Sequence, residues 1–137
     1  MDKITRTDAR KYIMTILYQA FLYSSNKQRC DIESVINQTL PMDNEFVRQI
    51  VYGVLEHKKE LYTIANENLT TWNMSRLGLT DQAIMCMGIY ELLYVETPSI
   101  ISINEAVELA KEYSDDKVKD MINAVLDKIY RGKLDNE

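Results

Sequence analysis

The sequence predicts an all-α protein of six to seven helices that pack as one compact domain over residues 1–137. Three observations support this fold class. Apolar residues recur three and four positions apart along most of the chain, which is the spacing of one buried helix face. Only 4 Gly and 2 Pro occur in 137 residues, too few for the tight turns of an all-β protein. A chain of this length also buries roughly two-thirds of its unfolded surface, so its core needs no metal or disulfide.

The first two helices are bounded by capping residues. Thr5 or Thr7 can cap a first helix that reaches about residue 23, because either hydroxyl can accept from an early backbone amide. Asp31 can cap a short second helix, which ends before Pro41 because proline disfavours a helical conformation in the residue before it. The apolar stripe of the first helix consists of Ala9, Ile13, Ile16, Leu17 and Ala20.

The middle of the chain contains a long helical segment from Asp43 to Trp72, in which we expect a break near His57. Thr80 is expected to cap the next helix. That helix stops before Pro98, for the same reason that the second one ends before its proline.

Two further helices complete the chain. Ser102 and Glu105 have the spacing of a capping box, so a helix is expected to begin at Ser102. The apolar positions that follow are Ile103, Ala106, Val107 and Ala110. The last helix begins at about Asp115, and residues 132–137 form a polar tail that is expected to fray.

No part of the sequence resembles an active site. His57 is the only histidine, and Cys30 and Cys86 have no metal-ligand or CxxC spacing. There is also no glycine-rich phosphate loop and no nucleophile with a histidine partner. We therefore expect no enzyme activity, no cofactor and no metal. Cys86 is expected to be buried, Cys30 to be a surface thiol, and His57 to be a solvated helix residue.

The charge is distributed unevenly along the chain. The net charge of −5 combines +4 in residues 1–30 with −9 in residues 31–137. A basic arm on an acidic body is expected when one surface meets a polyanion and another meets a basic partner. An uneven but merely solubilising surface explains the charge equally well. No stretch approaches the roughly 18 apolar residues of a membrane span, and the N-terminus lacks the apolar core of a signal peptide. We therefore expect a soluble, cytoplasmic protein.

Five sequence blocks carry a family resemblance. The first block is Arg6 with residues 9–10 and 17–19, and the second is residues 50–54 with Leu61, Ile64, Leu69, Trp72 and residues 76–77. The third block is residues 83–84 and 89–92 with Pro98. The fourth and fifth blocks are residues 102–111 and residues 123–128. In this order and spacing the chain resembles the NusB family of bacterial transcription antitermination factors. It departs from the family pattern at Thr7 and Asp8, which interrupt a run usually richer in arginine. It departs also at Met121 and Ala124, where phenylalanine and glycine are usual.

The resemblance implies a fold of two small three-helix-type bundles and a function without catalysis. It implies binding to the boxA element of nascent RNA, for example in ribosomal RNA operons, together with NusE, a ribosomal protein of the small subunit. The pair then joins other Nus factors on RNA polymerase. Members of the family with this fold can be monomers or dimers, so a homodimer remains open.

The candidate RNA-binding residues begin at the N-terminus. Arg6 and Arg10 are one helical turn apart and Lys3 is close by. Both arginines share the azimuth of the apolar stripe, so we expect the first turn to project beyond the packed layer and free its basic groups for phosphates. The resemblance adds Tyr18, matched to an aromatic near the RNA surface of the family, and Asp81, matched to an acidic residue there. An ordinary helix-flank tyrosine and a first-turn carboxylate explain these two equally well.

Two further hypotheses concern partners. The salt slope is the change in the logarithm of the RNA affinity per unit change in the logarithm of the salt concentration. If this chain neutralises about three phosphates of a single strand, the salt slope is on the order of −2, so RNA binding by this chain alone is expected to be weak. A basic partner can dock on acidic faces that comprise Glu105, Glu108, Glu112, Asp115 and Asp116, although a solvated helix face explains any one of them. One alternative is a protein–protein scaffold without RNA, in which Arg6 and Arg10 pair with local acids. The similar domain of an rRNA cytosine methyltransferase is not expected, because the chain has no room for a cofactor-binding sheet.

Overall fold

The computed structural model describes residues 3–135, and this part of the chain is all-α, as the sequence predicts. The helices are α1 (Arg6–Ser25), α2 (Ile32–Thr39), α3 (Glu45–Glu56), α4 (Lys58–Asn68), the short 3₁₀ helix η1 (Met74–Arg76), α5 (Leu79–Tyr94), α6 (Ser99–Tyr113) and α7 (Asp116–Asp135). None of the described helices is long and apolar enough to cross a membrane.

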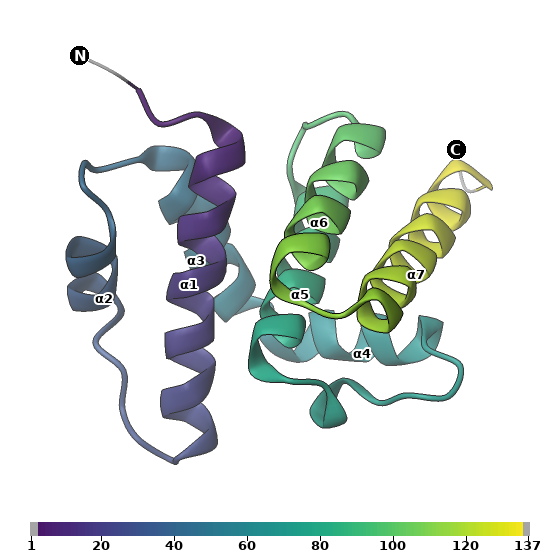
Figure 1. Cartoon of the computed structure of the whole chain (residues 1–137), viewed down its shortest axis with the longest axis horizontal. Coiled ribbons are helices and arrows are strands. Elements are labelled where there is room, and N and C mark those ends of the chain that lie inside the picture. The colour runs from purple at the N-terminus through teal and green to yellow at the C-terminus, as the bar shows by residue number, and fades with distance from the viewer. Residues whose placement is uncertain (1–2, 136–137) are drawn as a thin grey trace.

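The helices form the expected pair of small bundles (Figure 1). Helices α1, α2 and α3 make the N-terminal bundle, and α4 to α7 make the C-terminal bundle. Helix α4 is separate from α3 because the long helical segment breaks at His57, as predicted. The His57 ring is half-buried instead of solvated, because its Nδ1 lies 2.9 Å from the Gly53 carbonyl oxygen and its ring centroid 4.7 Å from that of Tyr94.

Helix α5 runs through the centre of the molecule. All eleven residues from Gln82 to Leu92 are buried, and α5 contacts α1, α3, α4, α6 and α7. Cys86 is buried in this run, as expected, whereas Cys30 is half-buried. The apolar stripe predicted for the first helix is also buried throughout. The core therefore lies on both sides of α5.

The N-terminal helix starts agree with the predicted caps, with one exception. The Thr5 hydroxyl accepts from the Asp8 amide at 3.1 Å, and Asp31 accepts from the Ser34 amide at 3.2 Å. The helical segment expected from Asp43 begins two residues later, at Glu45, because Asn44 caps α3 and the Asp43 carboxylate instead accepts from Arg48 Nε at 2.6 Å.

Two predicted starts in the second half of the chain are also wrong. Helix α5 begins after Gly78, before Thr80, because Leu79 already packs against the core. Helix α6 begins directly after Pro98, whose φ of −53° is pre-set for a helix start. Ser102 consequently lies inside α6, is 1% exposed and caps nothing. Its predicted capping box with Glu105 does not form.

Helix α7 starts where the sequence predicts and extends further than expected. Asp115 accepts from the Val118 amide at 2.8 Å and so caps the helix. The helix continues to Asp135, so residues 132–135 of the expected tail are helical and exposed. Residues 136–137 lie outside the described part of the chain.

Candidate nucleic-acid interface

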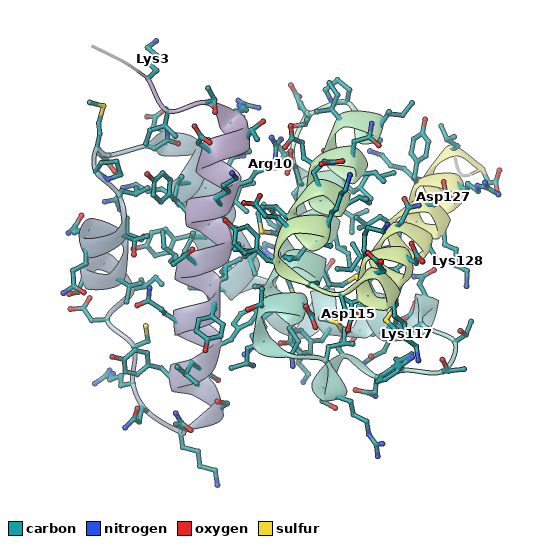
Figure 2. All side chains as sticks on the ribbon, viewed as in Figure 1. Lys3, Arg10, Asp115, Lys117, Asp127 and Lys128 are labelled. Atoms are coloured by element: carbon teal, nitrogen blue, oxygen red, sulfur yellow. The ribbon has the colours of Figure 1, made fainter. Side chains whose placement is uncertain are left out.

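Arg6 and Lys3 lie together at the N-terminal end of α1. Both side chains are exposed, and they line one hollow of about 550 Å³ beside Phe46. The Arg6 guanidinium carbon lies 4.4 Å from the centroid of the Phe46 ring, close enough for a cation–π contact. Arg6 makes no ion pair with any residue in the range 3–135. Its charge is therefore available to a ligand, and Figure 2 shows Lys3 extending outward from the same end.

Arg10 does not share this exposure, and the prediction that its guanidinium is free is wrong. Its side chain is 3% exposed and lies between α1 and the C-terminal bundle (Figure 2). It donates from Nε and Nη2 to both oxygens of Glu91. A second carboxylate, that of Glu105, lies 3.8 Å from Nη1. Arg10 lies on the side of the helix that carries the apolar stripe, as expected, but α5 and α6 pack against this side at Arg10 and cover its side chain. Arg10 follows the apolar stripe into the interface, where Glu91 compensates its charge.

The carboxylate of Glu105 ties α6 to the first turn of α1. Besides its contact with Arg10, it accepts a 2.9 Å hydrogen bond from the Thr7 hydroxyl. One turn further along α1 and two turns further along α6, Lys11 Nζ lies 3.6 Å from the Glu112 carboxylate. The start of α1 is therefore held against α6 by polar contacts on its surface and by a buried ion pair beneath them.

The predicted acidic partner face is consequently divided. Glu105 and Glu112 face α1, and Glu108 is exposed at the rim of the groove between α1 and α6. Asp115 is used as the cap of α7, and Asp116 is exposed in its first turn (Figure 2 labels Asp115). The structure therefore brings three of the five residues to one groove and leaves two at the start of α7.

Tyr18 and Asp81 lie at the other end of the same pair of helices. Helices α1 and α5 run antiparallel, since Arg10 meets Glu91. Tyr18 is about 12 Å along α1 from this ion pair and Asp81 about 15 Å along α5 in the same direction. Tyr18 is 38% exposed, and the half-buried Asp81 accepts from the Ser114 hydroxyl. The five predicted RNA-binding residues therefore lie in three places. Lys3 and Arg6 form an exposed basic end, and Arg10 lies in a buried ion pair. Tyr18 and Asp81 lie further away, toward the other end of α1 and α5.

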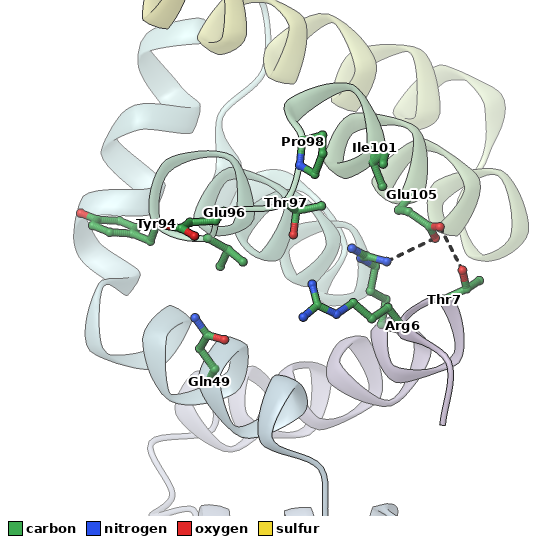
Figure 3. Close-up of a pocket in the computed structure, with 11 residues that line it drawn as sticks. Arg6, Thr7, Gln49, Tyr94, Glu96, Thr97, Pro98, Ile101 and Glu105 are labelled. Carbon is green, nitrogen blue, oxygen red and sulfur yellow. Dashed lines mark hydrogen bonds and ion pairs between the residues drawn. The ribbon is translucent and has the colours of Figure 1, made fainter. Parts of the chain in front are cut away.

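A cleft of about 710 Å³ opens beside Arg6, between α1, α3 and the connection from α5 to α6 (Figure 3). Its lining residues are Arg6, Thr7, Arg10, Gln49, Tyr94, Val95, Glu96, Thr97, Pro98, Ile101 and Glu105. Figure 3 shows the Arg6 side chain reaching into the cleft between Gln49 and Thr97. The sequence did not indicate Gln49, Glu96 or Thr97, because they come from segments far apart in the chain. A signal for Glu91 did exist, since it is the only charge in an otherwise uncharged run from residue 82 to 95.

Comparison with known proteins decides the family. The model of the NusB family matches residues 7–131. The chain belongs to the NusB family. A transcription antitermination protein NusB from Finegoldia magna is 36% identical over 132 residues, which cover 95% of this chain and 96% of the relative. The relatives that match this chain are named as transcription antitermination proteins, a class of factor that regulates transcription without catalysis, as the sequence predicts for this chain.

Solved structures of NusB proteins share the fold. A crystal form of NusB from T. maritima superposes with a TM-score of 0.84 at 25% identity, over 95% of this chain and 93% of that chain. A structure of the antitermination factors NusB and NusE in complex with dsRNA superposes with a TM-score of 0.77 over 93% of this chain and 96% of that chain. At 21% identity, the second comparison establishes the shared fold.

Proposed function

We propose that this chain is a transcription antitermination factor that binds boxA-type single-stranded RNA together with NusE. The observation that carries the proposal is an exposed arginine, Arg6, that has no ion pair with residues 3–135 and lies at the start of α1 in a chain that matches the NusB family over residues 7–131. The name of the Finegoldia relative supports the same activity. The structural neighbour in which NusB and NusE are bound to dsRNA supports NusE and RNA as partners.

In this proposal the RNA follows the edge of α1. Lys3 and Arg6 neutralise phosphates, and Tyr18 offers an aromatic face on which an unpaired base can stack. Asp81 lies near the Tyr18 end and borders the path. Arg10 acts beneath the surface, by holding the first turn of α1 in place. With two phosphate contacts instead of three, the expected salt slope is about −1.4.

A basic protein partner supplies the affinity that this chain lacks alone. Glu108 and Asp116 are the acidic positions most open to such a partner, because Glu105 and Glu112 already face α1 and Asp115 caps α7. With NusE bound, the complex joins other Nus factors on RNA polymerase in the cytoplasm and supports transcription of ribosomal RNA operons.

The alternative is a protein–protein scaffold without an RNA role, in which both arginines pair with local acids. Arg10 does so, but Arg6 does not within the described residues. The test is fluorescence anisotropy of a labelled boxA-type RNA and a scrambled RNA, with and without NusE, at two salt concentrations. We expect tighter and sequence-selective binding when NusE is present.

Charge reversal separates the two functions. Arg6→Glu should abolish most of the RNA affinity, whereas Arg131→Glu, an exposed arginine on α7 paired with Asp127, should leave it unchanged. Equal and feeble binding of both RNAs in the presence of NusE would leave the scaffold as the function. A light-scattering concentration series tests the homodimer at the same time, since only a self-associating chain increases in mass with concentration.

A further inference from the structure

The charges that line the cleft beside Arg6 sum to about −1 once Arg10 is paired with Glu91, which disfavours a phosphate as its natural occupant. Arg10 is already compensated by Glu91, and the remaining lining charges are Arg6 against Glu96 and Glu105. A phosphate placed here would face these two carboxylates, and like charges disfavour binding. The cleft therefore favours a ligand without a formal charge.

The polar groups of the cleft can both donate and accept hydrogen bonds. The Thr97 hydroxyl is shielded from solvent and has no hydrogen-bond partner among the described residues, and Figure 3 shows it directed into the cleft toward Arg6. The Gln49 amide offers a donor and an acceptor from an exposed position on α3. A buried polar group without a partner is uncommon in folded proteins and indicates a missing ligand or water.

The apolar wall and the size of the cleft fit a flat ring. Val95, Pro98 and Ile101 line one side. A guanidinium such as that of Arg6 stacks on planar bases as well as on aromatic side chains. The cleft volume of about 710 Å³ lies within the range of ordinary small-ligand sites.

We propose that this cleft holds one unstacked nucleobase of the bound single-stranded RNA. Thr97 and Gln49 hydrogen-bond the edge of the base, and one face of the planar Arg6 guanidinium packs on the base. The phosphates remain outside the cleft, where the N–H edge of Arg6 and the Lys3 side chain neutralise them. The inference rests on the proposed RNA-binding function and gives it a source of sequence selectivity, because hydrogen bonds to base edges distinguish one base from another.

The test combines two variants with a set of RNAs, in each of which one nucleotide is replaced by an abasic nucleotide. Thr97→Val and Gln49→Leu remove the hydrogen bonds, with Thr63→Val and Gln38→Leu as matched exposed controls on α4 and α2. RNA affinity is measured by anisotropy with NusE present. Each cleft variant should weaken binding by about 3- to 10-fold, the value of one or two hydrogen bonds, without a change in salt slope. Gln49→Leu lies on the surface, so it remains informative even if Thr97→Val impairs folding.

The decisive outcome is coupling at a single nucleotide. One abasic position should weaken binding to the wild-type protein more than it weakens binding to either cleft variant, because each variant has already lost one of the contacts that this base makes. The base-binding cleft is overturned if the wild-type protein binds RNA selectively but every abasic position weakens binding to the cleft variants as much as binding to the wild-type protein. That result would leave the proposed function intact. A salt slope shallower by about 0.7 in the cleft variants would identify a phosphate there instead. If the wild-type protein itself does not bind the RNA selectively, both proposals are refuted.

Discussion

Removing one partner of the buried Arg10–Glu91 ion pair should destabilise the whole domain. Both side chains are 3% exposed, and two charge-assisted hydrogen bonds join them. Arg10→Met leaves the Glu91 carboxylate buried without its partner, which costs about 3–5 kcal/mol. For a chain of 137 residues this corresponds to a melting temperature about 10–15 °C lower.

The double variant Arg10→Met/Glu91→Leu separates the loss of the pair from the loss of one charge. Replacing both charges by apolar side chains of similar volume is often neutral or stabilising, so most of the stability should return. Urea unfolding followed by circular dichroism measures both variants, and Arg131→Met serves as the exposed control, with an expected change within about 0.5 kcal/mol. The reasoning is refuted if Arg10→Met loses less than about 1 kcal/mol, or if the well-folded double variant has a shallower RNA salt slope. Either result means that Arg10 faces solvent and contacts phosphate.

Two further predictions concern α3, α5 and α7. A Cβ at Gly53 would lie 2.1 Å from the ring of Tyr90, so Gly53→Ala should cost about 1–3 kcal/mol in thermal unfolding. The same change at Gly132, where an added Cβ would meet no other side chain of residues 3–135 within 4 Å, should gain about 0.5–1 kcal/mol. Equal effects at Gly53 and Gly132 would contradict the packing. Burial raises the pKa of the Cys86 thiol to about 12, so at pH 8 a thiol reagent should label Cys30 in the native protein. Cys86 should then react only at the rate of unfolding.

The sequence predicted those features that depend on local spacing. The apolar stripe of α1 and the caps at Thr5 and Asp31 agree with the structure, because periodicity and capping involve residues within one or two turns. Ser102 shows the limit of this reasoning. Its spacing from Glu105 matched a capping box, but Pro98 starts the helix one turn earlier, and the signature falls inside α6.

Tertiary contacts account for the part of the candidate site that the sequence did not predict. Arg10 resembled a phosphate-binding residue because its counter-charge, Glu91, lies 81 positions away in the sequence. The cleft likewise combines Gln49 of α3 with Thr97 of the connection before α6. A lone carboxylate inside an apolar helix predicts that some basic residue must be buried beside it, but one sequence does not identify which one.

The position of α5 links the stability of the two bundles. Since five other helices contact it, neither bundle can open without exposing part of its buried run from Gln82 to Leu92. The domain should therefore unfold as one cooperative unit, with the backbone amides of this run exchanging only through global unfolding. A molecule that binds only the folded state at one bundle then raises the unfolding free energy of the other as well. A protein bound on the acidic side would in this way protect the RNA-facing end of α1 against global unfolding, even without a shared contact.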